Sequence, residues 1–145
     1  MTEFKKVILD TAPLIYFLDA DIKFGEKVKN IFEEILLSKR KIITSAVTCE
    51  EYLVYPYRTQ NYEKINAFME FINDCNIPIC PIDIEIAQKA AQIRAYYKDF
   101  KAMDSLQLAT ACIQECDLFL TNDKQLRQCK DILCITVEEW QISLK

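Results

Sequence analysis

Short apolar runs alternate with segments of helical periodicity along nearly all of the 145 residues. Five of these runs have the length of buried strands, and they span residues 6–10, 41–46, 77–82, 117–123 and 132–137. Strands joined by helices form right-handed crossovers, which build a mainly parallel sheet with helices on both faces. The sequence therefore predicts one domain, residues 1–145, with a three-layer α/β/α fold and about five strands.

Residues at helical spacing predict the segments between the strands. Apolar side chains that recur every three to four residues predict helices in six segments: around Pro13, over 24–36, from Val47, over 62–72, over 84–98 and over 104–115. The apolar run at 77–82 contains two prolines, which cannot donate a backbone hydrogen bond. We therefore expect this strand at an edge of the sheet.

Composition excludes several kinds of chemistry. The chain has no histidine, so neither a Ser-His-Asp nor a Cys-His nucleophile can be assembled. Its only glycine, Gly25, cannot form a glycine-rich phosphate loop. Seven cysteines without a Cys-x-x-Cys pair favour free buried thiols over a zinc site, although Cys112 and Cys116 stand one helical turn apart. No apolar run suits a signal peptide or a membrane span, so we expect a soluble cytoplasmic protein.

Carboxylates stand where the predicted strands end. Asp10 closes the first strand, Asp123 follows the fourth, and Glu51 lies in the helix after the second. Asp104 heads an otherwise apolar helix. Ligand sites of parallel sheets lie outside the carboxyl ends of the strands, so we expect the four acids at one edge. Such a cluster repels itself unless a cation lies among its members, and all-oxygen ligation favours Mg²⁺ or Mn²⁺ over zinc.

Each acid also has a purely structural interpretation. Asp10 fits an ordinary loop acid, whereas Asp104 and Asp123 fit caps of the helices that follow them. Thr48 and Glu51 match the spacing of a capping box, in which a hydroxyl and a carboxylate satisfy backbone amides at a helix start. The four positions taken together favour a shared cation site.

Four segments resemble the motifs of a known family. They read ILDTAPLIYFL, TSAVTCEEYLVYP, KAMDSLQLATA and LFLTNDKQL, in this order along the chain. Together they resemble the motifs of PIN-domain ribonucleases, and within that family most of all those of VapC toxins from toxin–antitoxin pairs. The resemblance covers nearly the whole chain. The chain departs from the family at Ser105 and Gln107, where many relatives carry alanine and histidine.

The resemblance implies a set of site residues. The four family acids fall on Asp10, Glu51, Asp104 and Asp123, of which the first three would hold the central Mg²⁺ or Mn²⁺ and Asp123 would have an outer role. Thr121 would orient a water or a carboxylate.

Two adjacent residues, Glu50 and Glu51, are candidates for the second acid. The family spacing Ser-x-x-Thr-x-x-Glu is met by Ser45, Thr48 and Glu51. The adjacent Glu50 would point about 100° away on a helix, so Glu51 is preferred.

The resemblance further implies metal-dependent cleavage of RNA, an antitoxin protein as partner and often a homodimer. The predicted helical hairpin within 27–71 has apolar residues to spare, which predicts an interface. These residues are Tyr52, Val54, Tyr55 and Tyr57.

A net charge of −4 is unusual for an RNA-binding protein, because RNA affinity comes mainly from phosphate neutralisation by basic side chains. Arg94, Lys98 and Lys101 stand at i, i+4 and i+7 ahead of the third acid, and they predict a weak RNA-binding surface. The segments SKRK (38–41) and YPYR (55–58) are further basic groups. A solvated helix face explains each group equally well.

Other acidic-pocket proteins fit less well. A receiver domain requires a pair of acids after the first strand, and a haloacid-dehalogenase-like phosphatase requires a second aspartate two residues after the first. Thr11 and Ala12 follow Asp10 instead, and the third strand offers only Asp83. A non-catalytic PIN-like module that binds RNA or protein would be expected to lack one of the four acids. The sequence therefore favours a nuclease.

Overall fold

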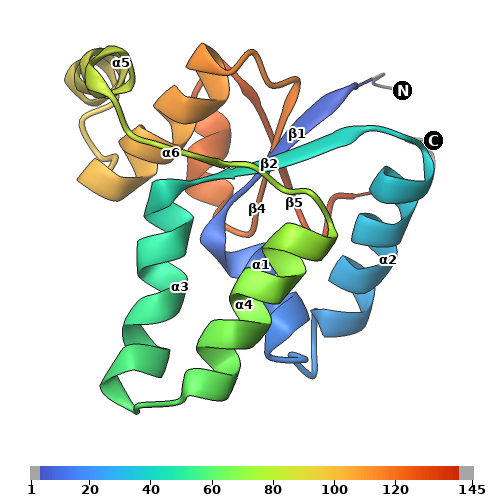
Figure 1. Ribbon diagram of the computed structural model, residues 1–145. Helices are drawn as coiled ribbons and strands as arrows, with labels where there is room; N and C mark the ends of the chain where they lie inside the picture. Colours follow the sequence, from blue (N-terminus) through green and yellow to red (C-terminus); the bar gives the residue numbers. More distant parts are fainter. Residues whose placement is uncertain (1–3, 141–145) are drawn as a thin grey trace.

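The computed structural model describes residues 4–140, which form a five-stranded parallel sheet with helices on both faces (Figure 1). The strands are β1 (Lys6–Leu9), β2 (Lys41–Ser45), β3 (Ile79–Cys80), β4 (Leu118–Thr121) and β5 (Leu133–Thr136). The helices are α1 (Thr11–Leu18), α2 (Gly25–Leu37), α3 (Ala46–Arg58), α4 (Tyr62–Asp74), α5 (Ile84–Tyr96), α6 (Ala102–Ile113) and the 3₁₀ helix η1 (Lys124–Gln128). The strand order β3-β2-β1-β4-β5 makes β1 central.

Side chains of β1 alternate between two hydrophobic cores, because successive residues of a strand point to opposite faces. Val7 and Leu9 pack with α1 to α4 on one face, and Ile8 packs with α5 and α6 on the other. All three side chains are fully buried, as expected for a parallel strand covered on both faces. The predicted α/β/α fold with a parallel sheet is confirmed.

The third strand lies at the edge of the sheet, as its prolines predicted. It pairs only with β2 and contains two residues, Ile79 and Cys80. Pro78 and Pro81 flank it, and because neither has a backbone N–H the ladder cannot extend past them.

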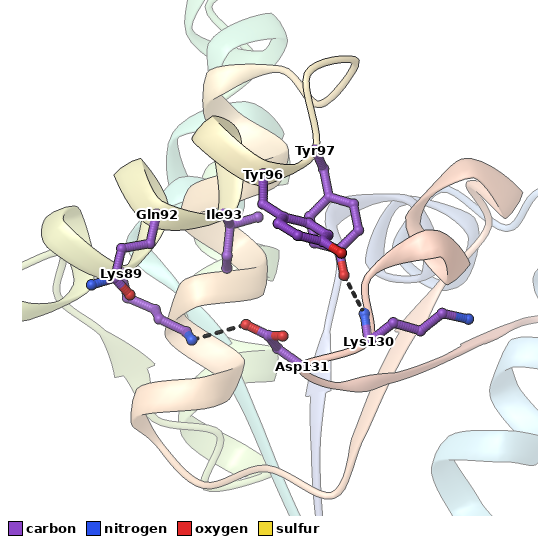
Figure 2. Close-up of a pocket in the computed structure, with 7 residues that line it drawn as sticks. All are labelled: Lys89, Gln92, Ile93, Tyr96, Tyr97, Lys130 and Asp131. Atoms are coloured by element: carbon purple, nitrogen blue, oxygen red, sulfur yellow. Dashed lines mark hydrogen bonds and ion pairs between the residues drawn. The ribbon is translucent and has the colours of Figure 1, made fainter.

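The junction between α5 and α6 differs from the prediction. Helix α5 ends at Tyr96 instead of residue 98, and α6 begins at Ala102 instead of residue 104. Tyr97 is extended, its ring stacks on Phe100 at 5.0 Å, and its hydroxyl oxygen accepts a 2.8 Å hydrogen bond from the backbone N–H of Lys130 (Figure 2). Contacts distant in sequence therefore end the helix, and helical periodicity does not register them.

A pocket beside this junction shows how α5 is held against the segment before β5. Lys89 of α5 forms a 2.9 Å ion pair with Asp131, next to the Tyr97 contact (Figure 2). Both side chains are partly exposed, so we assign the pair at most about 1 kcal/mol of stability.

The seven cysteines are free thiols. Burial raises the pKa of Cys112 to about 11 and that of Cys116 to about 12, so neither is a thiolate at neutral pH. Within residues 4–140, no helix combines the length and the apolar character needed to cross a membrane.

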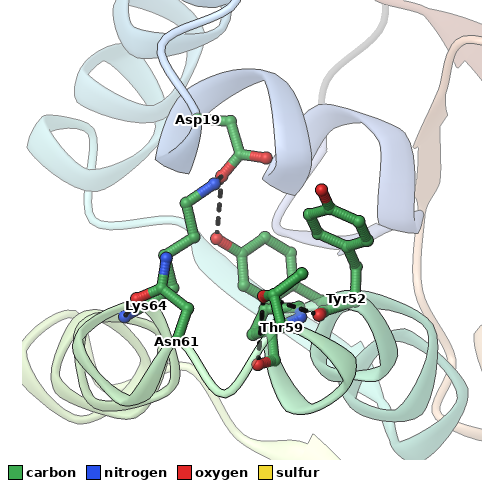
Figure 3. Close-up of polar contacts among 7 residues, drawn as sticks. Asp19, Tyr52, Thr59, Asn61 and Lys64 are labelled. Atoms are coloured by element: carbon green, nitrogen blue, oxygen red, sulfur yellow. Dashed lines mark hydrogen bonds and ion pairs between the residues drawn. The ribbon is translucent and has the colours of Figure 1, made fainter.

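Tyr52 joins three helices, and its predicted exposure was wrong. The side chain is buried, its ring stacks on Phe68 of α4 at 5.0 Å, and its hydroxyl donates a 3.0 Å hydrogen bond to Asp19 after α1 (Figure 3). Lys64 of α4 reaches the same carboxylate at 3.3 Å. Burial raises the pKa of Tyr52 above its usual range, so it stays a protonated donor. The hairpin of α3 and α4 is thereby fastened to α1.

We expect Tyr52→Phe to lower the free energy of unfolding by about 1 kcal/mol, the usual net worth of one hydrogen bond. Tyr55→Phe is the matched control, because Tyr55 lies on the same helix and is 64% exposed. Urea unfolding of both variants measures the difference. Equal stability of the two variants would show that the Tyr52 hydroxyl contributes nothing.

Candidate active site

The parallel order of the three central strands brings their carboxyl ends to one edge, where the predicted acids gather. Asp10 directly follows β1, and Glu51 lies in α3, which directly follows β2. Thr121 is the last residue of β4, and Asp123 comes two residues later. Asp104 joins them from the first turn of α6. The charges of Glu51 and Asp104 raise the pKa of Asp10, and the charge of Asp123 raises that of Asp104, so each of the four acids lies within electrostatic reach of at least one other.

The Asp10 carboxylate is held by donors from two elements. The Thr121 hydroxyl donates to Oδ2 at 2.7 Å, and the backbone N–H of Thr11 donates to Oδ1 at 2.8 Å. The pKa of Asp10 is nevertheless raised to about 6, because burial and the negative charges of Glu51 and Asp104 raise it by more than the two hydrogen bonds lower it. Asp10 is thus a fixed carboxylate whose negative charge is poorly stabilised.

Glu51 contacts the residue next to Asp10, and the capping-box interpretation fails for it. The cap of α3 is Ser45, which accepts from the backbone N–H of Val47 at 3.1 Å, so Thr48 lies inside the helix. Glu51 instead accepts a 2.6 Å hydrogen bond from the Thr11 hydroxyl. The neighbouring Glu50 is exposed and lines an apolar pocket on the other side of α3.

Asp104 is the third residue of α6, and the helix cap is Lys101, so the alternative interpretation of Asp104 as a helix cap fails. Burial raises the pKa of Asp104, and the charge of Asp123 raises it further, while the backbone N–H of Lys101 lowers it. Asp123 does act as a cap, because its Oδ1 accepts from the backbone N–H of Gln125 at 3.0 Å. Its own N–H donates to the Thr121 hydroxyl at 3.0 Å, which ties it to the Asp10 contact.

Gln107 occupies the centre of the polar network beneath the acids, a role that sequence reasoning missed. It is 2% exposed; its amide oxygen accepts from the Ser45 hydroxyl, and its nitrogen donates to the Thr48 hydroxyl at 2.7 Å. The same nitrogen lies 3.4 Å from Oδ1 of Asp10. The sequence did contain a signal for this role, namely a glutamine on the apolar face of a helix, because a buried amide needs hydrogen-bond partners.

The site is rich in oxygen donors and poor in compensating positive charge. The ion pairs found within residues 4–140 involve none of the four acids. Carboxylates and hydroxyls are the ligands that Mg²⁺ and Mn²⁺ accept, so the donor chemistry fits a divalent ion. In the same part of the chain, however, no three acidic or cysteine side chains converge closely enough to form a finished metal cage.

The basic residues predicted to bind RNA are exposed but do not form one helical row. Arg94 lies in the last turn of α5, whereas Lys98 lies beyond the end of that helix and Lys101 caps the next. Their spacing therefore does not place them on one helix, and their role in RNA binding stays a prediction. Lys101 still lies close enough to Asp104 to lower its pKa.

A family comparison agrees with this geometry. Residues 7–132 match the model of the PIN domain. The chain belongs to the PIN domain family. A search of curated protein sequences gave no match.

The PIN fold also relates the chain to solved toxin–antitoxin structures. A VapBC2 complex from Rickettsia felis, bound to promoter DNA, has a TM-score of 0.73 at 14% identity and covers 90% of this chain and 98% of its own. A toxin–antitoxin complex from Klebsiella pneumoniae has a TM-score of 0.73 at 21% identity, covering 92% and 99%. VapC20 from Mycobacterium tuberculosis, a sarcin–ricin loop cleaving toxin, has a TM-score of 0.66 at 13% identity, covering 84% and 93%. At these identities, the likeness concerns the fold.

We expect the buried charge of Asp10 to make the metal-free PIN domain less stable as pH rises. The folded state keeps the Asp10 proton up to about pH 6, whereas the unfolded chain releases it near its ordinary pKa of 3.8. This contribution to stability is complete below the unfolded pKa and is lost as pH rises through the folded one.

Asp10→Asn removes that titration. We compare the free energies of unfolding of variant and wild type in a buffer that contains a metal chelator. The value for the variant minus the value for wild type should rise by up to about 3 kcal/mol between about pH 4 and pH 7. Using the change with pH as the readout cancels any constant effect of the altered hydrogen bonds. A difference that stays flat across this range would show that the folded protein does not shift the pKa of Asp10.

Proposed function

We propose that this PIN domain is a metal-dependent endoribonuclease and acts as the toxin of a toxin–antitoxin pair. The observation that carries the proposal is the acid cluster itself. Asp10, whose pKa burial raises to about 6, is grouped with three other carboxylates, and the ion pairs found in residues 4–140 involve none of them. Structural caps need no such crowding, whereas a Mg²⁺ or Mn²⁺ site does.

Asp10, Glu51 and Asp104 would hold the ion, and Asp123 would contribute from the rim. A bound divalent ion supplies a water of lowered pKa and neutralises charge on the phosphate that is attacked. The chain supplies the positioning. Thr121 and the Thr11 amide fix Asp10, and the Thr11 hydroxyl fixes Glu51. Fixed carboxylates lower the cost of assembling the site, because their rotamers are already restricted.

An antitoxin protein is the proposed partner, and a homodimer is the proposed assembly. Toxin–antitoxin complexes are among the solved structures that share this fold. Val54, Tyr55 and Tyr57 on α3 are 40%, 64% and 57% exposed, so the apolar face predicted from the sequence remains uncovered at these positions. An uncovered apolar face of this kind favours a protein partner. We further propose that the protein acts as a single domain in the cytoplasm.

Purified protein should cleave single-stranded RNA in Mg²⁺ or Mn²⁺ and stop in EDTA. Glu51→Gln should lower the rate by about two orders of magnitude or more, because it removes a ligand charge from the ion site. Glu50→Gln is the matched control and should keep most activity, since Glu50 is exposed on the far side of α3.

Full cleavage in EDTA would exclude the metal mechanism. If Glu50→Gln loses activity and Glu51→Gln keeps it, the second acid is Glu50 and not Glu51. A folded wild-type protein that binds RNA without cleaving it in either metal would be a non-catalytic PIN module.

A further inference from the structure

The basic segment SKRK lines a cleft at the amino edge of the sheet, away from the acids. The cleft has a volume of about 810 Å³ and is lined at the starts of β1 and β2 and the turn before β4. Figure 1 shows that β1 starts on the side of the sheet opposite to the starts of α1 and α3. Four residues of β1 at about 3.3 Å each separate this edge from Asp10 by roughly 13 Å.

Five of the 18 basic residues of the chain line this one cleft, although the chain as a whole is acidic. They are Lys5, Lys6, Lys39, Arg40 and Lys41. The ion pairs found within residues 4–140 use none of them. Two acids, Glu115 and Asp117, also line the cleft, so its lining carries more positive than negative charge. Asp117 accepts the backbone N–H groups of Lys5 and Lys6 at 2.7 and 3.0 Å.

Arg40 is held in place and has an unused donor. Its guanidinium lies 4.1 Å from the centre of the Phe4 ring, and Phe4 packs edge-on against Trp140 at 5.4 Å. Its Nη1 is buried and has no hydrogen-bond partner in the described chain. A buried donor without a partner is costly, and the planar guanidinium fork matches phosphate oxygens. Arg40 therefore adds a positive charge in a fixed position to the lining of the cleft.

A structural role in the fold explains only part of this charge. Lys39 and Arg40 follow the end of α2, where cations interact favourably with the helix dipole. Lys5 and Lys41 come from the starts of two neighbouring strands and have no such reason to gather. The cations are spread over two strand starts and a turn instead of converging on one point, an arrangement that suits a row of phosphates better than a single phosphate ion.

We propose that this cleft binds the sugar–phosphate backbone of RNA as a second contact, remote from the acid cluster. The proposal rests on the proposed ribonuclease function, because it assigns the contact to the substrate. Four carboxylates repel phosphates until a metal ion is bound, so affinity for RNA must come from elsewhere on an acidic protein. The cleft supplies that affinity without touching the reacting phosphate.

The test compares two charge-matched double variants in RNA binding. Lys39→Gln/Lys41→Gln removes two exposed cations of the cleft, and Lys29→Gln/Lys130→Gln removes two exposed cations elsewhere. Binding is measured by fluorescence anisotropy in EDTA, with a labelled single-stranded RNA longer than the roughly 4–16 nucleotides that such sites span. Thermal melting verifies that both variants are folded.

The cleft variant should bind RNA about tenfold more weakly at low salt, and the slope of log affinity against log salt should fall by about 1.4, the value for two lost single-strand phosphate contacts. The control variant should change far less. Equal losses in both variants would overturn the proposal, because they would reflect net charge alone.

Competitors separate the possible ligands. Inorganic phosphate should displace the RNA only at concentrations where ordinary salt also does. Displacement by phosphate far below that range would overturn the proposal in favour of a single-phosphate site. If the cleft variant binds RNA as well as wild type does but no longer binds vesicles of anionic phospholipid, the proposal is overturned in favour of a membrane contact. The binding assay does not depend on cleavage, so the two proposals can fail separately. If the wild-type protein does not cleave RNA but the cleft variant binds RNA more weakly than wild type, only the proposed catalysis is contradicted.

Discussion

The carboxylate of Asp10 stands at the end of the central strand, where burial and neighbouring negative charge oppose its ionisation and two donors hold it in place. Glu51 and Asp123 are connected to Asp10 through the two threonines that supply these donors. Thr121 contacts both Asp10 and the backbone of Asp123, and Thr11 contacts both Asp10 and Glu51. Two threonines therefore fix the geometry of three acids, while the charge of the acids remains without a basic partner in the described chain.

Much of the fold followed from periodicity alone, because strands buried on both faces and amphipathic helices leave clear patterns. The run KVILD predicted the central strand, and Pro78 and Pro81 predicted the edge strand. What the patterns missed depends on contacts distant in sequence. Helix α5 ends at Tyr96 because Tyr97 is held by Phe100 and Lys130, and Tyr52 is buried because α4 and Asp19 cover it.

The candidate site was predictable at the level of its acids and not at the level of its support. Strand ends identified Asp10 and Asp123, and motif spacing selected Glu51 over Glu50. The network through Gln107 joins α6 to Ser45 and Thr48, and its partners come from segments about 60 residues away in sequence. No local pattern specifies such pairings. A buried glutamine signals that partners exist without identifying them.

The two edges of the sheet carry opposite charge, and this separation suits a nuclease whose reacting site is acidic. Carboxylates gather at the carboxyl edge, and five basic residues line the cleft at the amino edge. Before metal binds, the acid cluster repels a polyanion, whereas the basic edge attracts it. The acid cluster is therefore the point on which the proposed chemistry depends.

Thermal melting of wild type and Asp104→Asn, with and without Mn²⁺, tests that cluster most directly. Asparagine keeps the size of the side chain and removes one charge that Asp123 repels. The metal-free variant should melt at the same temperature as wild type or higher. Mn²⁺ at about one hundred times its dissociation constant should stabilise wild type by about 2.7 kcal/mol and the variant by much less. Equal stabilisation of both proteins by Mn²⁺ would contradict a metal site built on Asp104.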